Sequence, residues 1–239
     1  ITVNIIPSND DLAALPDYLA LLQDCGADAI IAADVSVVSL AKKYAPKLPL
    51  HISTQTSILN YEAASFWADQ GAERIVLARE LSLPEIAEIR AKTPKELEIE
   101  AFVHGAMCIS YSGRCLISQY MTGRDANHGA CAQPCRWKYS LVEEKRPGEY
   151  FPVVEDDRGT YLYNSKDLCM IEHIPELVQA GVDSFKIEGR NKTAYYAAGI
   201  TSAYRRAVDA YCANPDGFVL PRDIHEEIGK VSHRNYYTG

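Results

Sequence analysis

The sequence lacks the short motifs that identify many well-known enzyme classes. It contains no GxGxxG and no GxxxxGK[ST] run, so neither of the usual glycine loops that cradle nucleotide phosphates is present. HExxH and GxSxG are missing as well, which removes the common metalloprotease and serine hydrolase motifs. No apolar run approaches the roughly 20 residues needed to span a bilayer, so we expect no membrane-embedded segment.

The sequence contains fewer basic residues than acidic ones. The 239 residues hold 24 Lys and Arg against 32 Asp and Glu, which gives a formal net charge of −8. Because a protein that coats nucleic acid non-specifically is normally basic, any contact with nucleic acid has to be local here. Hydrophobic residues make up 47% and charged residues 23%, which is ordinary for a globular protein and excludes wholesale disorder.

The chain also lacks an initiating methionine, because residue 1 is Ile. Residues 1–6 (ITVNII) already alternate as a buried strand does, so we expect the chain to begin inside a structural element. We therefore expect a piece of a longer protein, and the absence of a signal peptide carries no information about its compartment.

Three stretches share one local pattern, in which an amphipathic helix leads into a buried strand. Each helix ends at a glycine able to adopt a left-handed C-terminal conformation, and a short apolar strand follows. Such strands are typical of parallel sheets covered by helices. The three units span residues 21–32, 66–77 and 177–187, and further strands are expected at 48–53 and 97–104.

This alternation predicts an α/β fold built from βαβ units. An open doubly wound sheet and a (β/α) barrel both fit it. The missing nucleotide-binding glycine motif removes the usual reason for the open sheet and favours an incomplete (β/α)8 TIM-like barrel. We expect residues 1–239 to form a single barrel domain, truncated at both ends, with a long helix at 191–211.

A long cysteine-rich insertion interrupts the pattern at residues 105–159. Gly, Cys, Arg, Asn and Pro are crowded there, and no helical or alternating period survives beyond a turn. A long irregular segment inside a compact domain is usually functional or disordered. The aromatic and apolar residues of 101–140 argue against disorder there, whereas the charged stretch 143–158 is expected to be a mobile loop. The barrel pattern resumes at 160–168.

Five of the seven cysteines fall in or just after this segment. The first four have the spacing C-x6-C-x15-C-x3-C, and the five are Cys108, Cys115, Cys131, Cys135 and Cys169. The other two, Cys25 and Cys212, lie in predicted helices and are expected to be core residues.

Three kinds of site use such a cluster. Disulfides are typical of secreted proteins, whereas this composition resembles an intracellular, cytoplasmic protein, in which thiols stay reduced. Structural zinc prefers C-x2–4-C pairs, and only Cys131–Cys135 comes close to that spacing. An iron–sulfur cluster tolerates wider spacing because its ligands come from different loops. Residues 101–140 carry a net charge of +3, which suits an anionic cluster.

Several longer runs make the chain resemble the collagenase-like peptidase family U32. They are EAFVHGAMCISYSGRCLIS at 100–118, GACAQPCRW at 129–137, NSKDL at 164–168 and SFKIEGR at 184–190. STQ at 53–55, LAREL at 77–81, GEY at 148–150 and the acidic pair at 155–156 extend the match over essentially the whole chain.

Within that family, the tyrosine-rich stretch 108–118 and the CRW run most resemble the prephenate-dependent tRNA uridine hydroxylases. The resemblance implies oxygen-independent hydroxylation of carbon 5 of the wobble uridine, with tRNA as the partner and prephenate as the co-substrate. Relatives modify an rRNA cytidine or ubiquinone precursors, and the latter carry a [4Fe–4S] cluster. Compared with the barrel of the family, this chain lacks the opening strands and the small C-terminal β-domain.

The resemblance also implies that four of the five clustered cysteines ligate such a cluster. Quinone-pathway relatives indicate Cys108, Cys115, Cys131 and Cys169. Relatives of the tRNA type share Cys135, and some have no thiol at the position of Cys169. Both ligand sets stay open at this point.

Polar residues near predicted strand ends complete the candidate site. His104 and Glu188 are the candidate catalytic residues, with His104 as a proton shuttle, an RNA-phosphate contact or a hydrogen-bonded structural residue. Lys186, Glu188 and Arg190 alternate along one predicted strand and so share a face. Lys186 and Arg190 would there bind a dicarboxylate such as prephenate, unless the three charges neutralise one another. The other candidate substrate-binding residues are Gln55, Arg79 and Lys166.

Aromatic residues of the insertion stand among arginines. Tyr111, Trp137 and Tyr139 fit a base-stacking surface, and packing over a cluster explains them equally well.

The leading hypothesis is a cytoplasmic iron–sulfur tRNA hydroxylase that uses prephenate. The first alternative is a peptidase that acts on collagen-like chains through a Cys108–His104 pair, for which no third group is identifiable. The second is a non-enzymatic scaffold whose cysteines hold structural zinc.

Overall fold

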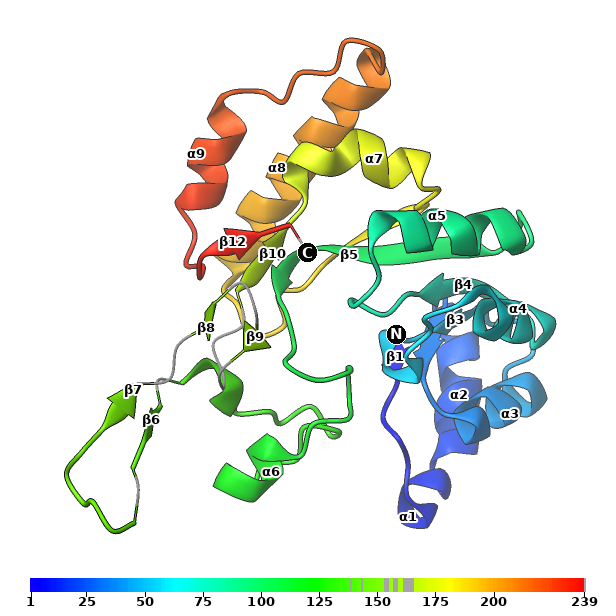
Figure 1. Cartoon of the computed structure of the whole chain (residues 1–239). Helices are drawn as coiled ribbons and strands as arrows, with labels where there is room; N and C mark the ends of the chain where they lie inside the picture. The colour runs from blue at the N-terminus through cyan, green and yellow to red at the C-terminus, as the bar shows by residue number, and fades with distance from the viewer. Residues whose placement is uncertain (138, 143, 153–154, 157–158, 161–165, 239) are drawn as a thin grey trace.

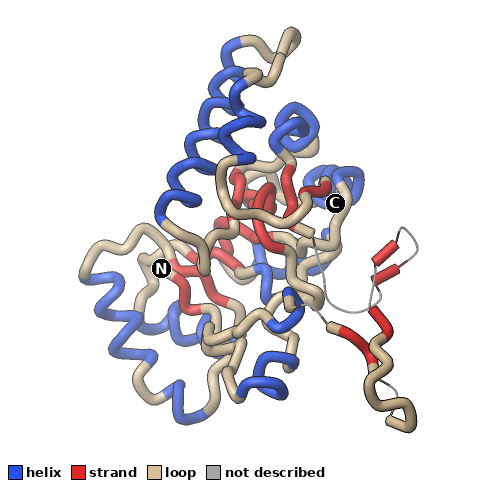
Figure 2. The backbone as a smooth tube through the Cα atoms, turned by 90° about the vertical axis from the view of Figure 1, so that its left-hand side faces the viewer, coloured by secondary structure: helices blue, strands red, loops and turns tan. Residues whose placement is uncertain are grey.

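The computed structural model describes residues 1–137, 139–142, 144–152, 155–156, 159–160 and 166–238. One mixed sheet with helices packed around it forms the main body, and two short hairpins stand away from it (Figure 1). The backbone tube in Figure 2 shows the strands of this sheet gathered between the helices.

The main sheet has eight strands, and the hairpins add four more among the described residues. The main strands are β1 (Thr2–Val3), β2 (Ile30–Ala32), β3 (Leu50–Ile52), β4 (Ala72–Val76), β5 (Glu98–Ala106), β10 (Asp167–Cys169), β11 (Ser184–Ile187) and β12 (Tyr236–Tyr237). The hairpin strands are β6 (Ser140–Leu141) with β7 (Phe151–Pro152), and β8 (Glu155–Asp156) with β9 (Gly159–Thr160).

The α-helices alternate with the main strands along most of the chain. They are α1 (Asn9–Leu12), α2 (Leu15–Asp24), α3 (Val35–Tyr44), α4 (Tyr61–Asp69), α5 (Leu83–Lys92), α6 (Ile117–Thr122), α7 (Ile174–Gln179), α8 (Ala194–Ala213) and α9 (Asp223–Gly229). Short 3-10 turns occur at η1 (Thr54–Thr56), η2 (Pro134–Arg136) and η3 (Ile171–His173). No helix among the described residues is long and apolar enough to cross a bilayer.

The helix ends that the sequence pattern predicts are confirmed. Helices α2, α4 and α7 are followed by Gly26, Gly71 and Gly181, whose φ angles are +71°, +82° and +81°. Only glycine adopts this left-handed region without strain, so each helix stops there and the chain turns into the next strand. The predicted alternation of helices and buried strands, and with it the α/β class, is therefore found in the structure.

The strand order from β1 to β5 follows the chain, and all four pairings are parallel. β11 pairs with β5 in parallel, while β10 pairs with the end of β5 in the antiparallel direction and with β12 in parallel. Among the described strands β1 pairs with β2 alone, so these strands form an open path. The closed barrel is not found in the described part of the chain.

The two faces of the parallel strands differ in chemistry. One face is apolar and joins the core that the helices complete, with Ile52, Ile75 and Ile99 fully buried. The other face carries charged side chains such as Arg74 and Glu100, because successive residues along a strand point to opposite faces of the sheet. The core therefore fixes which residues of each strand turn toward the polar side.

Lys186 belongs to a charge network on the polar face. Its Nζ donates to Glu100 Oε1 at 2.7 Å, and Arg74 Nη1 lies 3.3 Å from Glu100 Oε2. Burial raises the pKa of Glu100, but Lys186 and Arg74 more than offset this and hold it below its usual value. Lys186 is thus balanced by a carboxylate from β5, which the sequence did not predict.

Residues 105–159 are less irregular than the sequence suggests. The segment contains α6, η2 and the two hairpins, and β5 extends into it as far as Ala106. The predicted long helix is present as α8. The strand predicted at 160–168 is seen as β10, and residues 161–165 lie outside the described part.

Tyr204 ties α8 to the end of β5 and to β10. Its hydroxyl donates to the Val103 carbonyl at 2.7 Å and accepts from the Met170 N–H at 3.1 Å. All of these groups are buried. The hydroxyl therefore reinforces a direct bond between the same two groups, in which the Met170 N–H donates to the Val103 carbonyl at 2.9 Å.

Replacement of this hydroxyl tests the tie. Tyr204→Phe should lower the free energy of unfolding by about 0.5–1.5 kcal/mol, because it removes the buried hydrogen bonds of the hydroxyl while the Met170 N–H keeps its bond to the Val103 carbonyl. Urea unfolding of the full-length protein measures the change. The matched control is Tyr195→Phe on the exposed side of α8, which should have little effect. Equal stability of the two variants would contradict the assignment.

Candidate functional site

Polar side chains and a thiol gather where four parallel strands end. Gln55 lies in η1 after β3, Arg79 comes three residues after β4, Cys108 two residues after β5, and Glu188 directly after β11. The carboxyl ends of parallel strands meet at one edge of a sheet, and this is where α/β proteins place functional groups. The sheet order therefore brings together residues that are up to 133 positions apart.

Arg79 is held on three sides. Its Cζ lies 3.8 Å from the centroid of the Phe102 ring, and its Nη2 is 3.7 Å from Glu188 Oε2. Its Nη1 donates to the Ala106 carbonyl at 3.5 Å. Burial lowers the pKa of Arg79, and Glu188 and Cys108 partly offset that shift. The side chain is only 12% exposed, so its position is fixed by packing.

Three buried polar atoms have no hydrogen-bond partner among the described residues. They are Gln55 Oε1, Arg79 Nε and Arg136 Nε. Arg136 lies within electrostatic range of Arg79, since its charge helps to lower the pKa of Arg79. Because an unsatisfied buried polar group costs roughly 1–3 kcal/mol, such groups are rare unless a ligand completes them. Two guanidinium donors and one acceptor suit an anion that also carries a hydroxyl or N–H.

A cleft of about 700 Å³ opens beside these residues. Arg79, Cys108 and Lys166 contribute polar groups to its lining, and Phe102 and Leu168 contribute apolar ones. Lys166 is exposed, and its backbone carbonyl accepts from Arg234 Nη2 at 3.3 Å. The cleft thus offers positive charge, an apolar wall and a thiol to one ligand.

Four thiols of the cysteine-rich segment lie near one another. Burial raises the pKa of Cys135, Arg136 opposes this shift, and the thiols of Cys108, Cys131 and Cys115 add to it. Cys135 is buried and the other three are half-buried. The Gln133 N–H donates to Cys131 Sγ at 3.3 Å. The structure therefore brings the four thiols into electrostatic contact with each other and with a cation.

Within the described residues, no group of three or more His, Cys, Asp or Glu side chains is arranged to hold a single metal ion. Four thiolates around one Zn²⁺ stand roughly 4 Å apart, since each Zn–S bond is about 2.3 Å. A cluster of several irons is larger and separates its thiolates further.

Cys169 has a different environment. It lies on β10 opposite His104 of β5. Burial raises the pKa of its thiol, and the charge of Glu172 adds to this rise. Hydrogen bonds with the Ile171 backbone and the Tyr204 hydroxyl oppose it. The thiol therefore belongs to the tyrosine-rich interior around His104, and not to the group formed by the other four.

His104 is enclosed in that interior and is 1% exposed. Its Nδ1 is 3.4 Å from the Tyr204 hydroxyl and its Nε2 is 3.5 Å from that of Tyr236. The ring of Tyr196 lies 6.1 Å away. Burial lowers the pKa of His104 to about 4, although the charge of Asp167 favours protonation. The ring is therefore neutral near pH 7, and these contacts are those of a structural histidine.

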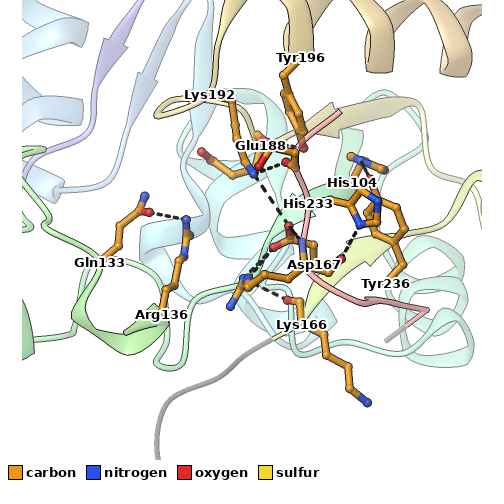
Figure 3. A network of polar contacts seen from close by, with 12 residues as sticks. His104, Gln133, Arg136, Lys166, Asp167, Glu188, Lys192, Tyr196, His233 and Tyr236 are labelled. Atoms are coloured by element: carbon orange, nitrogen blue, oxygen red, sulfur yellow. Dashed lines mark hydrogen bonds and ion pairs between the residues drawn. The ribbon is translucent and has the colours of Figure 1, made fainter. Parts of the chain in front are cut away.

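A carboxylate network under His104 was missed in the sequence. Asp167 Oδ1 accepts from Arg234 Nε at 3.1 Å and Nη2 at 2.7 Å, and Lys192 Nζ lies 4.0 Å from Oδ2 (Figure 3). Burial raises the pKa of Asp167, but the hydrogen bonds and charge of Arg234 lower it overall. His233 stacks on Tyr236 at 4.1 Å. The network fixes β12 against β10.

Of the predicted row of Lys186, Glu188 and Arg190, only Lys186 lies within a strand. β11 ends at Ile187 with a register irregularity, so Glu188 and Arg190 follow the strand. Glu188 pairs with Arg79, and its Oε1 accepts from the Arg190 N–H at 3.0 Å. The Arg190 guanidinium packs against Gly129, where a Cβ would overlap it. The three charges therefore serve three separate contacts.

Comparison with known proteins gives one family match and several close relatives. The model of the family described as "Peptidase family U32" matches residues 1–239. The chain is 43% identical to "tRNA hydroxylation protein P1" of Bacillus subtilis and 37% identical to "tRNA hydroxylation protein P" of Escherichia coli. Both matches cover 100% of this chain, and they cover 56% and 60% of the relatives.

A further relative is named as an rRNA-modifying enzyme. The chain is 40% identical over 210 residues to "23S rRNA 5-hydroxycytidine C2501 synthase" of Escherichia coli. That match covers 88% of this chain and 30% of the relative. The chain therefore spans little more than half the length of the tRNA hydroxylation proteins it matches, and less of this one.

The buried neutral His104 predicts a pH dependence of stability. Its pKa in the folded protein, about 4, lies below the ordinary value of 6.5. The unfolded chain thus binds the extra proton, and the contribution is full above pH 6.5 and is lost as pH falls toward 4. This one group should remove about 2 kcal/mol of stability between pH 7.5 and pH 5.

The test compares unfolding free energies at these two pH values. His104→Asn should be less stable than the wild type at pH 7.5 but lose about 2 kcal/mol less on acidification. His225→Asn is the matched control, because His225 is exposed. If His104→Asn kept the full wild-type pH slope, the neutral buried state of His104 would be refuted.

Proposed function

Because the chain belongs to the peptidase family U32, with relatives named as RNA-hydroxylating proteins, we propose that it acts in RNA hydroxylation. The family resemblance carried by the sequence motifs is confirmed by the match over residues 1–239. The specific reaction we propose is oxygen-independent 5-hydroxylation of the wobble uridine of tRNA, with prephenate as co-substrate. A cytoplasmic location is part of the proposal. The active species is the full-length protein, since this chain spans 56–60% of the tRNA hydroxylation relatives.

The barrel remains part of this proposal. The run of parallel strands from β1 to β5 alternates with helices, as in TIM-like barrels. The site residues at the carboxyl ends of β3, β4, β5 and β11 lie where such barrels place their functional groups.

The observation that carries the proposal is the set of unsatisfied buried atoms beside four thiols. Arg79 Nε and Arg136 Nε are donors without partners, and Gln55 Oε1 is an acceptor without one, within the described residues. Prephenate carries two carboxylates and a hydroxyl, so it would complete all three. Arginine binds carboxylates through two parallel hydrogen bonds, which fixes both position and orientation.

This arrangement changes which cations are assigned to the co-substrate. The Lys186 Nζ donates to Glu100 Oε1 at 2.7 Å, so its charge is already paired within the protein. Arg79 faces the cleft with Glu188 at 3.7 Å, Glu80 also lines that cleft, and Lys166 adds an exposed positive charge there. We therefore assign carboxylate binding to Arg79 and Arg136, with Lys166 and Arg190 at the periphery.

The donor set fits an iron–sulfur cluster held by Cys108, Cys115, Cys131 and Cys135. Four thiolates and the cations Arg79 and Arg136 match the charge of an all-thiolate cluster. When bound, the cluster would supply one-electron redox chemistry. The N–H of Gln133 at Cys131 Sγ is the kind of hydrogen bond that tunes a cluster thiolate.

Two candidate catalytic residues become positioning residues in this scheme. Glu188 holds the Arg79 guanidinium, so it acts on a ligand through that arginine. His104 is buried and neutral and sets the end of β5 from which Cys108 follows. Its described hydrogen bonds go to Tyr204 and Tyr236, and none joins it to Cys108 in the described part of the chain. No observation therefore favours a Cys–His peptidase.

Cysteine variants test the ligand set. After anaerobic purification the full-length protein should be brown and contain iron and sulfide. Cys135→Ser should lose most of the iron, because it removes one of four ligands, whereas Cys169→Ser should keep it. Cys212→Ser is the control, because Cys212 is exposed. The prediction that Cys25 and Cys212 are core residues is wrong, since both are exposed. A colourless protein with stoichiometric zinc, or iron loss in Cys169→Ser alone, would contradict the assignment.

Mass spectrometry of tRNA nucleosides tests the reaction. A strain without this gene and any related hydroxylase gene should lack modifications derived from 5-hydroxyuridine, and the full-length gene should restore them. Arg79→Gln should restore them at least roughly tenfold less, because a charge-assisted hydrogen bond contributes about 1.5–3 kcal/mol. Arg205→Gln alters an exposed arginine on α8 and should behave as wild type. Unchanged wobble modification in the deletion strain would refute the proposal.

A further inference from the structure

The outer side of the cysteine-rich segment presents an exposed aromatic surface. It consists of the exposed Leu116, Tyr120, Met121 and Trp137 and the half-buried Tyr139, with Arg114 and Arg124 beside them in the chain. We propose that this aromatic surface binds unpaired nucleotides of an RNA by base stacking. The inference rests on the proposed function and names the surface through which the RNA reaches the site.

The exposure of these side chains is unusual for their type. Tyr120 is 91% exposed, Leu116 is 77% exposed and Trp137 is 44% exposed. Leu116 and Tyr120 are one helical turn apart on α6, since the Tyr120 N–H donates to the Leu116 carbonyl at 2.9 Å. They therefore lie on the same side of the helix. Contiguous exposed apolar side chains on a protein surface mark interaction sites.

Contacts between α6 and the segment after η2 join the members into one surface. The Tyr139 hydroxyl lies 3.4 Å from Met121 Sδ and donates to the Pro134 carbonyl at 2.7 Å. The rings of Trp137 and Tyr139 have centroids 6.5 Å apart and are tilted by 30°. Residues separated by almost 20 positions are thus held side by side, with the Trp137 ring beside that of Tyr139.

The positive charge beside the aromatic surface favours RNA as its ligand. Arg114 and Arg124 are exposed, and Asp125 is the one carboxylate in the sequence 101–140. Asp125 is already paired with His128 Nδ1 at 2.7 Å. Arginines among exposed aromatic rings are what proteins use for unpaired bases, because every base has a face for stacking and every linkage has a phosphate. This local charge occurs in a chain whose net charge is −8.

The surface is joined directly to the thiols. Leu116 follows Cys115, and Trp137 comes two residues after Cys135. The Arg136 side chain between them supplies one of the unsatisfied buried donors. A base stacked on this surface would therefore lie next to the cysteines that are proposed to hold the reaction centre.

Binding measurements with two RNAs test the surface. A fluorescent hairpin with an unpaired loop and a continuous duplex of the same stem are titrated with the full-length protein. The wild type should prefer the hairpin. Tyr120→Ala and Trp137→Ala should each weaken hairpin binding by roughly 5- to 100-fold and leave duplex binding almost unchanged. Arg124→Gln should weaken both RNAs and lower the salt slope by about 1.

Matched variants on α8 provide the controls. Tyr195→Ala and Arg205→Gln remove an exposed tyrosine and an exposed arginine away from α6, and both should bind as wild type. Hairpin binding unchanged in Tyr120→Ala and Trp137→Ala would overturn the surface while leaving the proposed reaction intact. So would a change of oligomeric state in these variants with RNA binding preserved, since the surface would then join two copies. Failure of the wild type to bind either RNA would instead overturn the proposed function.

Discussion

The strand β5 is the element on which the site depends. Its alternating residues carry Glu100, which balances Lys186, and Phe102, on which Arg79 is stacked. The His104 side chain lies in the buried tyrosine-rich interior. Gly105, the next residue of the strand, has a φ of +108°. A side chain at Gly105 would collide with the Glu188 carbonyl, so only glycine lets β5 and the end of β11 approach this closely. Through that approach Glu188 reaches Arg79.

The charged side chain at this site is buried but not fully paired, whereas the charged side chains in the rest of the polar interior are paired. Glu100 and Asp167 are each held by two cations, and their pKa values are lowered despite burial. Arg79 is as enclosed as these carboxylates but has one carboxylate at 3.7 Å and an unsatisfied Nε within the described residues. Charges that fold a protein are paired by the fold, whereas a charge left incomplete indicates a ligand.

The α/β class and most strand positions follow from local pattern, because a glycine such as Gly181 ends its helix by its own backbone preference. Local sequence pattern does not predict which charged side chains pair. Lys186 finds Glu100, 86 positions away, and Asp167 finds Arg234, 67 positions away, through strand order that no local pattern contains. Of the expected row at Lys186, Glu188 and Arg190, only Lys186 lies in β11, which ends at Ile187. Arg79, Gln55 and Cys108 were identified as candidates, but only the sheet order brings them to one edge.

The division of the five cysteines into four and one follows from the direction of the strands. Cys108 leaves the parallel sheet at the carboxyl end of β5, on the side where the segment carrying Cys115, Cys131 and Cys135 lies. β10 runs antiparallel to β5, so it places Cys169 beside His104 and beneath Tyr204, inside the body of the fold. A thiol in that position is desolvated without a neighbouring cation, which disfavours the thiolate that a metal requires. Cys135 is desolvated as well, but the charge of Arg136 opposes the rise in its pKa.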